Sequence, residues 1–416
     1  MQRSLTLSGN TWPRVLSGLT GLGMIVASIL TVRHFFLANY PTSLYEGSFC
    51  DISAFLNCDS SAYSVLAELG GVPLGYFGLV VGALVALGAV FPSTAFERTN
   101  KSIAVVNGVG VVGLFVFSVS ALRSLCLLCS GYWILSLVSL GLFWRYGIDG
   151  DEPRWILRYF QPSPKYLSTF AVVTVAGAYG FALFHDARKD AQSGAVAARF
   201  VEQYFNLPEV ELPSVISPFM TVQSTENFED APIRVIEYGD LLCPDCEYLN
   251  EQLELLKKEF AGKINVAFQF FPLDAQCNDV VAKDKHPGAC DLSYMAAYDP
   301  SKFTAIHDEV FANLRAAKDP EWRRELARRY QVQAALTDTA TKELVHRIIN
   351  TGTEYEKTSD RYAHGIRSTP TMIVNNRMII GTFPYEQLRA IFQALVDEEE
   401  RGAKKKFLEN WEQGSP

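Results

Sequence analysis

Six of the eight cysteines in this 416-residue chain form three close pairs, and such pairs can carry thiol–disulfide exchange. The pairs are Cys50 with Cys58 in an acidic loop, Cys126 with Cys129 in a Cys-Leu-Leu-Cys, and Cys243 with Cys246 in a Cys-Pro-Asp-Cys. One pair alone could be a structural disulfide or half of a metal site. Three pairs that can lie on one side of a membrane instead indicate a path along which electrons pass two at a time.

The chain that must position these pairs has two unlike halves. Residues 1 to about 185 are mostly apolar, and the remainder has the composition of a soluble α/β protein. A hydrocarbon core about 30 Å thick is crossed by roughly 20 apolar helical residues. The first apolar stretch is long and is followed by no clear small-residue cleavage site, which favours a span over a signal peptide. The predicted spans are residues 15–37, 73–91, 102–122, 126–144 and 166–184.

Basic residues predict the orientation of these spans, because short cytoplasmic loops are rich in lysine and arginine. Neither residue type occurs between Phe36 and Pro73, where the first cysteine pair lies. The N-terminal tail, the second loop and the fourth loop carry Arg3, Arg14, Arg98, Lys101, Arg145, Arg154, Arg158 and Lys165. This distribution predicts a cytoplasmic N-terminus and, after five spans, a soluble domain on the other side. All eight cysteines then lie on the side of an oxidising compartment, where disulfides persist.

The soluble half has the order of elements found in thioredoxin. A strand leads into the Cys-Pro-Asp-Cys and a helix, a second strand and a long helical stretch follow, and a hairpin and a last helix end the domain. The strands are predicted at 233–238, 264–271, 371–374 and 378–380. Asn375 and Asn376 suit the hairpin turn because asparagine tolerates positive φ. A Cys-x-x-Cys near such a unit is a redox signature.

The Cys-Pro-Asp-Cys has a specific chemical logic at a helix start. Cys243 would lie at the helix N-terminus, where unpaired N–H groups and the helix dipole stabilise a thiolate. Pro244 suits the first turn because its missing N–H costs little there. Cys246, one turn later, is close enough to resolve a mixed disulfide. Asp245 should partly oppose the thiolate, which predicts a less oxidising site than one with a cationic residue in its place.

The soluble half resembles the thiol oxidase branch of the thioredoxin superfamily in its Cys-Pro-Asp-Cys, its helical insertion and its Phe-Pro-Leu-Asp-Ala-Gln-Cys segment. The resemblance implies that the Thr369–Pro370 bond is cis and faces the cysteines, although an X–Pro bond considered alone is more often trans. It also implies a disulfide between Cys277 and Cys290, structural in the simpler interpretation and a second exchange pair in the alternative. Zinc binding with His286 is a weaker alternative, because the cysteine spacing is too wide for a standard half-site.

The membrane half resembles the vitamin K epoxide reductase family, specifically its bacterial and chloroplast members fused to a thioredoxin-like domain. The Cys-x7-Cys loop before the second span and the Cys-x-x-Cys that opens the fourth match the two cysteine pairs of the family. Ser64 matches a serine that members carry after the second loop cysteine, and Gly75 and Gly78 match the start of their second span. The resemblance covers nearly the whole chain and is weakest in the insertion and the linker.

This resemblance implies an order of electron transfer. Reduced protein substrates would reduce the Cys-Pro-Asp-Cys disulfide, whose first cysteine would then attack Cys50. Cys58 would pass the electrons to Cys126, and Cys129 would contact and reduce a quinone of the ubiquinone, menaquinone or phylloquinone type. Candidates for the quinone pocket, which could equally pack helices or form the interfacial aromatic belt, are Tyr76, Phe77, Phe115, Phe117 and Trp133. No metal site is expected.

We therefore predict a polytopic α-helical membrane domain, a four-helix bundle with a fifth linking helix, followed by an α/β thioredoxin-fold domain with a helical insertion. The predicted parts are a vitamin K epoxide reductase-like domain at 1–145, a cytoplasmic loop, fifth transmembrane helix and stalk at 146–206, a linker at 207–230, a thioredoxin-like domain at 231–400 and a charged C-terminal tail at 401–416.

The predicted function is a quinone-dependent membrane thiol oxidase that forms disulfide bonds in exported proteins. Its expected partners are reduced exported proteins and the membrane quinone pool, and a net charge of −8 gives no reason to expect nucleic-acid binding. We expect a bacterial inner membrane with the thioredoxin-like domain in the periplasm, or a thylakoid membrane with that domain in the lumen.

Three other functions remain open at this stage. The first is a quinone or quinone-epoxide reductase that uses the thioredoxin domain as its donor. The second is a disulfide isomerase, which the quinone route disfavours because isomerases must be kept reduced. The third is a membrane-anchored binding protein with structural disulfides, which has no use for a Cys-x-x-Cys at the membrane edge.

Overall fold

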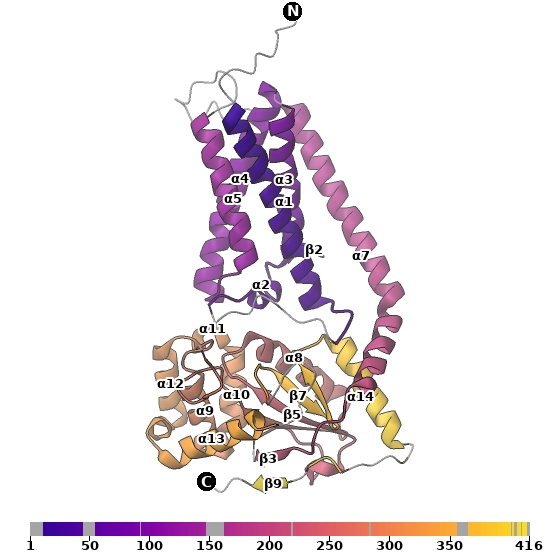
Figure 1. Ribbon diagram of the computed structural model, residues 1–416, viewed down its shortest axis with the longest axis vertical. Helices are drawn as coiled ribbons and strands as arrows, with labels where there is room; N and C mark the ends of the chain where they lie inside the picture. Colours follow the sequence, from indigo (N-terminus) through magenta and orange to yellow (C-terminus); the bar gives the residue numbers. More distant parts are fainter. Residues whose placement is uncertain are drawn as a thin grey trace, which may run out of the picture. The chain divides into compact units, whose positions relative to one another are not determined.

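The computed structural model describes residues 11–44, 55–91, 93–146, 162–217, 219–282, 284–355, 365–400, 402, 406–408 and 410–413. The chain divides into two compact units, which are described separately (Figure 1). The first combines Met1–Phe36 with Leu56–Ala191, and the second combines Leu37–Phe55 with Gln192–Pro416.

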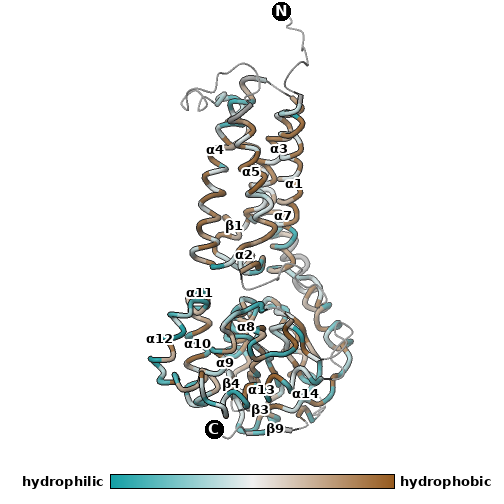
Figure 2. Tube along the Cα trace, turned by 60° about the vertical axis from the view of Figure 1, so that its left-hand side comes forward, coloured by the Kyte–Doolittle hydropathy of each residue, from teal (hydrophilic) through white to brown (hydrophobic). Residues whose placement is uncertain are grey.

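The first unit is a bundle of apolar helices. Its helices are α1 (Thr11–Asn39), α3 (Leu74–Val90), α4 (Thr94–Phe117), α5 (Leu127–Tyr146) and the first part of α7 (Pro164–Asn206). Within the described residues, three helices are long and apolar enough to cross a membrane, and α3 and α5 are shorter apolar helices. Figure 2 shows this hydropathy as brown along α1, α3, α4 and α5. Each of the five predicted spans is therefore helical in the structure.

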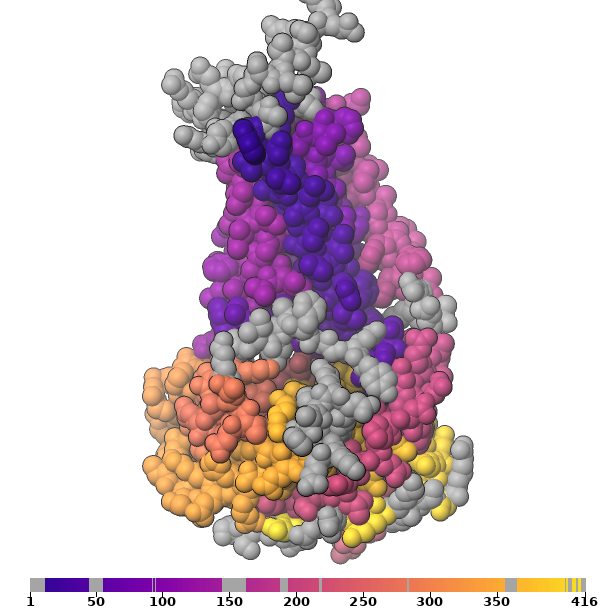
Figure 3. All heavy atoms as spheres, in the orientation of Figure 1, coloured from indigo at the N-terminus to yellow at the C-terminus, as the bar shows by residue number. Residues whose placement is uncertain are grey.

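Small residues let α1 approach its neighbours closely, as is common between helices in membranes. A Cβ at Gly21 would lie 2.6 Å from the backbone nitrogen of Ala86 in α3. A Cβ at Gly23 would lie 2.8 Å from the Leu135 side chain of α5, and Figure 3 shows α1 directly against α5. Larger side chains at these glycines would push the helices apart.

A tight turn brings the second cysteine pair to the start of α5. The π-helical turn η1 (Ser118–Leu122) extends α4, and Arg123 follows with a left-handed φ of 47°. The Ser118 hydroxyl donates to the Ser124 carbonyl at 2.5 Å and closes the turn. Residues 123–125 therefore form a very short loop between the predicted spans 102–122 and 126–144, and α5 begins directly after Cys126.

A compact segment precedes α3 in the first unit. It contains the short helix α2 (Asp59–Ala62) and a two-stranded hairpin of β1 (Glu68–Leu69) and β2 (Val72–Pro73). Gly70 and Gly71 form its turn with φ values of 59° and 78°, a conformation that favours glycine at both positions. The hairpin delivers the chain into α3 at Leu74.

The second unit is built on a five-stranded sheet in the order β4-β6-β5-β7-β8. The strands are β4 (Met220–Val222), β5 (Ile233–Gly239), β6 (Ile264–Phe270), β7 (Thr371–Val374) and β8 (Arg377–Ile380). β5 and β6 are parallel and the other neighbours are antiparallel. Asn375 and Asn376, both with positive φ, form the predicted β7–β8 turn.

Helices cover both faces of this sheet. One face packs against α8 (Pro244–Glu259), α14 (Tyr385–Glu400) and the end of α7, where Tyr204 donates to the Val374 carbonyl at 2.8 Å. The other face packs against the insertion, which contains α9 (Ala289–Tyr298), α10 (Phe303–Ala312), α11 (Leu314–Ala317), α12 (Pro320–Tyr330) and α13 (Thr339–Thr353). This is the predicted thioredoxin fold with a helical insertion.

Two predicted segments differ from the structure. The linker at 207–230 was expected to be irregular, but it contributes β4 to the sheet edge and β3 (Ser214–Ser217), which pairs in parallel with β9 (Asn410–Gln413). The charged tail predicted at 401–416 also contributes to the core, since Phe407 is fully buried and stacks on Phe228. The rings of Phe407 and Trp411, which lie among charged residues in the sequence, both pack against Phe228. The predicted cytoplasmic loop within 146–206 lies largely outside the described residues.

Candidate redox sites

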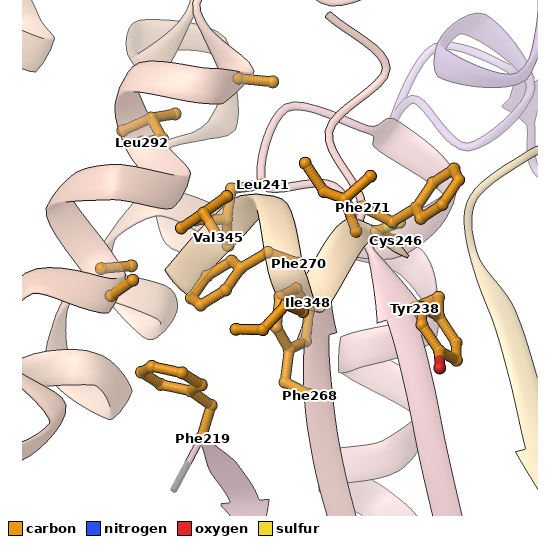
Figure 4. Packing of buried hydrophobic residues seen from close by; sticks show 14 of the residues in the cluster. Phe219, Tyr238, Leu241, Cys246, Phe268, Phe270, Phe271, Leu292, Val345 and Ile348 are labelled. Atoms are coloured by element: carbon orange, nitrogen blue, oxygen red, sulfur yellow. The ribbon is translucent and has the colours of Figure 1, made fainter. Parts of the chain in front are cut away.

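The Cys-Pro-Asp-Cys lies at the junction of β5 and α8. Cys243 is the N-cap residue of α8, and Pro244 is the first helical residue. Cys243 and Cys246 are thiols in the structure, and both are buried. Figure 4 shows Cys246 in the same buried cluster as Phe270 and Phe271. The cysteines therefore occupy the helix-start position that the sequence predicted for them.

The Thr369–Pro370 peptide bond is cis and lies against the cysteine pair. The Cys243 thiol donates to the Thr369 carbonyl at 3.6 Å, across 126 positions of sequence. The chain that leads into β7 therefore lies beside the first cysteine of the pair. The structure thus brings the two supporting residues predicted from sequence, Thr369 and Pro370, to the cysteines.

A buried glutamate that the sequence interpretation did not identify lies beneath this site. Glu237 is 1% exposed in β5, and its Oε1 has no hydrogen-bond partner among the described residues. Burial, together with the charge of Cys243, raises the pKa of Glu237 to about 8. Burial, the hydrogen bond to Cys243 and nearby charge also raise the pKa of Cys246. The raised pKa of Cys246 favours its thiol form over its thiolate.

Glu237→Gln is expected to make the Cys243–Cys246 pair more oxidising only above the pKa of Glu237, about 8. Below that pH the carboxyl is neutral and resembles glutamine. Above it, the carboxylate of the wild type repels the thiolates and destabilises the reduced pair. Each ten-fold change in the equilibrium constant between the pair and glutathione corresponds to about 1.4 kcal/mol. Glutathione equilibria of both proteins, well below and well above that pH, measure the difference. The exposed Glu251→Gln is the control and should not shift the glutathione equilibrium. A Glu237→Gln shift of equal size at both pH values, or the same shift in Glu251→Gln, would contradict the role given to the charge of Glu237.

The insertion carries a disulfide close to the same site. Cys277 and Cys290 are bonded, with Cα atoms 6.0 Å apart, and both are buried. His286, which lies between them in sequence, has its Nδ1 2.7 Å from Oδ2 of Asp240. The imidazole therefore engages a carboxylate at the end of β5.

The second cysteine pair lies at the start of α5 in the first unit. Cys126 and Cys129 form a disulfide with Cα atoms 5.2 Å apart, and the Cys129 N–H donates to Cys126 Sγ at 3.1 Å. Both residues line a cavity of about 270 Å³ within the helix bundle. The lining is mainly apolar, as is usual for pockets that hold small organic ligands.

Cys58 lines the same cavity as this disulfide. Its segment is held there by a parallel bridge between Leu56 and Leu125 and by the Asn57 N–H, which donates to the Leu125 carbonyl at 3.2 Å. The bridge therefore aligns Cys58 with the chain that leads into Cys126. Cys58 is itself disulfide-bonded, and its predicted partner Cys50 lies outside the described residues.

A buried histidine–aspartate contact fixes the other side of the Cys58 segment. His34 of α1 has its Nε2 3.0 Å from Oδ1 of Asp59, the residue after Cys58, and both side chains are almost fully buried. Ionisable residues within a membrane bundle are costly and are usually paired with one another. The pair thus ties the Cys58 segment to α1 at the edge of the cavity, which His34 also lines.

Other predicted residues divide between the cavity and helix packing. Ser64 lines the cavity, as do Gly75, Gly78, Phe77, Phe117 and Trp133. Tyr76 instead reaches α7, where its hydroxyl donates to the Thr174 carbonyl at 3.4 Å. Phe115 does not line the cavity and packs edge-on against Trp133.

Polar residues inside the spans complete the cavity and were missed from the sequence. The Tyr132 hydroxyl donates to Asn107 Oδ1 at 2.9 Å, and the Asn107 amide donates to Ser136 at 2.5 Å. Asn107 and Tyr132 both line the cavity. The sequence did contain a signal for Asn107 and Tyr132, because polar residues inside apolar spans often mark functional positions.

Comparison with known proteins supports both halves of this description. A family model for the vitamin K epoxide reductase family matches residues 14–144, and a thioredoxin family model matches residues 228–394. Disulfide bond formation protein D of Bacillus subtilis is 27% identical over 172 residues, covering 39% of this chain and 71% of that protein. Probable disulfide bond formation protein D of Bacillus cereus is 31% identical over 104 residues, covering 24% of this chain and 44% of that protein.

Solved structures similar to this chain include a periplasmic thioredoxin-like protein from Salmonella enterica serovar Typhimurium, with a TM-score of 0.31 and 16% identity over 40% of this chain and 86% of that one. Another is alpha-DsbA1 of Wolbachia pipientis, with a TM-score of 0.34 and 15% identity over 45% of this chain and 95% of that one. The fold assignment does not depend on them, since it follows from the sheet order and the family models. The chain is a membrane protein in which a vitamin K epoxide reductase family domain at residues 14–144 is followed by a thioredoxin-like domain at residues 228–394.

Proposed function

We propose that this protein is a membrane thiol oxidase that forms disulfide bonds in exported proteins and delivers the electrons to a quinone. Thiol–disulfide oxidoreduction is supported by the two family models and by the names of the curated relatives. The observation that carries the finer proposal is that Cys58 and the Cys126–Cys129 disulfide line one cavity inside an apolar helix bundle.

The proposed reaction begins at the thioredoxin-like domain. The thiolate of a substrate protein attacks the oxidised Cys243–Cys246 pair, and a second substrate thiolate resolves the mixed disulfide, which leaves the substrate oxidised and the pair reduced. Cys243 then attacks the loop disulfide at Cys50, and Cys246 resolves that second mixed disulfide. Each exchange breaks one S–S bond and forms another, so no electron is lost between pairs.

The loop pair then reduces the pair at the cavity. The thiolate of Cys58 attacks Cys126, which releases Cys129 as a thiolate, and Cys50 resolves the mixed disulfide by attacking Cys58. The Leu56–Leu125 bridge supports this order because it aligns the segment that carries Cys58 with the segment that carries Cys126. The reduced Cys126 and Cys129 are then left facing the cavity.

The cavity fits a quinone head group. Its volume of about 270 Å³ is close to the lower end, about 300 Å³, of typical small-molecule pockets. Phe77, Phe117 and Trp133 offer ring contacts, and Asn107 and Tyr132 offer polar groups that could orient a carbonyl. A bound quinone would supply the chemistry that accepts two electrons and two protons as the Cys126–Cys129 disulfide re-forms.

The proposed setting is a bacterial inner membrane, with the N-terminus in the cytoplasm and the thioredoxin-like domain in the periplasm. The absence of lysine and arginine from 37–72 supports this orientation, since cytoplasmic loops are rich in both. Exported proteins with reduced cysteines would then reach Cys243 without crossing the membrane.

Quinol formation by the full-length protein in nanodiscs tests the proposal. Reduced, unfolded protein is supplied as donor without oxygen, and soluble analogues of ubiquinone and menaquinone are each followed by absorbance. We expect one disulfide to form in the substrate for each quinol. If the substrate is oxidised only after oxygen is admitted, and both quinones stay unchanged, the quinone part of the proposal is overturned.

A further inference from the structure

A fully buried histidine–aspartate pair lies next to the Cys-Pro-Asp-Cys and has no place in the exchange steps described above. His286 Nδ1 and Asp240 Oδ2 are 2.7 Å apart, and both side chains are 0% exposed. Burying ionisable groups is costly unless hydrogen bonds satisfy their polar atoms. The contacts of Asp240 therefore indicate what the pair does.

Asp240 connects its side chain to the active-site turn. Its Oδ1 accepts from the Leu242 N–H and its Oδ2 from the Leu273 N–H, both at 2.7 Å. Its own backbone N–H donates to Cys246 Sγ at 3.4 Å, and its carbonyl accepts from the Cys243 N–H at 3.0 Å. Movement of the Asp240 carboxylate would thus change the hydrogen bonds of both cysteines.

His286 is fixed from the opposite side by the disulfide-closed loop. Cys277 and Cys290 join the ends of that loop, and the His286 N–H donates to the Leu273 carbonyl at 3.0 Å. Asp274 closes the loop further, since its Oδ2 accepts from the Gly288 N–H at 2.7 Å. The imidazole consequently has little freedom to leave Asp240.

We propose that His286, held against Asp240 by the disulfide-closed loop, is a positioning residue that makes the Cys243–Cys246 pair more oxidising. The inference rests on the proposed function only in taking that pair as the exchange site. A hydrogen bond to sulfur stabilises a thiolate more than a disulfide, and the Asp240 N–H provides one to Cys246. Without His286, the Asp240 carboxylate would lose a partner, and its charge would oppose the nearby thiolates.

The glutathione equilibrium constant of the Cys243–Cys246 pair tests this proposal in the full-length protein. Differential alkylation followed by peptide mass spectrometry reads each cysteine pair separately. His286→Leu is expected to lower the equilibrium constant for oxidation of glutathione about ten-fold, which is about 30 mV for a two-electron couple. His286→Asn keeps a donor near the position of Nδ1 and should restore most of the loss.

Two further variants separate positioning from a general loss of structure. The double variant Cys277→Ala, Cys290→Ala opens the loop and should also lower the glutathione equilibrium constant of the Cys243–Cys246 pair. Adding His286→Leu to the double variant should lower that constant little further. His307 is the matched control, because it is a buried histidine of the same insertion with its Nδ1 2.9 Å from Asp308 Oδ1. His307→Leu should leave the constant of the Cys243–Cys246 pair unchanged.

The proposal is overturned if the His286→Leu variant is folded, as judged by protease resistance, and keeps the glutathione equilibrium constant of the wild type. It is also overturned if His307→Leu lowers that constant as much as His286→Leu does. If His286→Leu does not fold, the Cys277→Ala, Cys290→Ala variant decides: an unchanged glutathione equilibrium constant in that variant overturns the proposal. A wild-type Cys243–Cys246 pair that never exchanges with glutathione would overturn both this inference and the proposed function. Failure of quinol formation alone would affect only the proposed function, since the glutathione measurement involves no quinone.

Discussion

Cys129→Ala is expected to abolish quinol formation, by at least ~1,000-fold, because the variant loses the last sulfur of the proposed relay. The Cys126–Cys129 disulfide lines the cavity, and quinol can form only while that disulfide re-forms. In the variant the Cys126 thiolate can attack Cys58 of the loop disulfide, which breaks the Cys50–Cys58 bond and releases Cys50 as a thiol. Cys50 can only reverse this step, and no thiol at position 129 is left to carry the electrons on to a quinone. Peptide mapping without reductant should therefore find a Cys58–Cys126 mixed disulfide in the variant.

Ser130→Ala is a matched control for this prediction. Ser130 follows Cys129 in α5, and its hydroxyl donates only to the Cys126 carbonyl at 2.8 Å among the contacts of the described residues. The control should keep its turnover and should not accumulate the mixed disulfide. Continued quinol formation by Cys129→Ala would show that the electrons leave the chain at another site.

Gly110→Leu is expected to raise the KM for quinone strongly while leaving thiol exchange intact. Gly110 lies in α4 and lines the cavity, and a Cβ added there would meet nothing within 4 Å. A leucine therefore has room at the cavity wall without disturbing the backbone. Pocket contacts of this size change kcat/KM by about 10- to 200-fold. Quinol formation at varied quinone concentration, with a small dithiol as donor, measures the effect.

Gly113→Leu provides the control on the same helix. A Cβ at Gly113 also meets nothing within 4 Å, but this residue does not line the cavity. Its leucine variant should keep the quinone KM of the wild type. Equal effects of the two substitutions would show that α4 itself is perturbed, and an unchanged KM in Gly110→Leu would place the quinone elsewhere.

The positions of the cysteine pairs could be predicted because local rules determine them. A Cys-x-x-Cys between a strand and a helix has its first cysteine at the helix N-terminus, and Cys243 is the N-cap of α8. The same pattern at the edge of an apolar stretch placed Cys126 directly before α5. Asn375 and Asn376 identified their hairpin by their tolerance of positive φ.

Residues that depend on long-range packing could not be predicted in this way. His34 and Asp59 are 25 positions apart, and His286 and Asp240 are 46 apart, so that only the fold brings each pair together. The aromatic residues of 401–416 were hidden by surrounding charges, although Phe407 is a core residue. Glu237 could have been found from the sequence, since burying a carboxylate within an apolar strand is costly and therefore suggests a functional role.

The central claim is that electrons enter at the thioredoxin-like domain and leave through the membrane domain, and Cys243→Ala in full-length protein tests it most directly. Quinol formation is compared with two donors, a reduced unfolded protein and dithiothreitol, which is small enough to reduce the loop pair itself. The account predicts that wild-type protein uses both donors, whereas Cys243→Ala loses the protein donor and keeps dithiothreitol. A Cys243→Ala variant that still forms quinol from the protein donor at the wild-type rate would contradict the account.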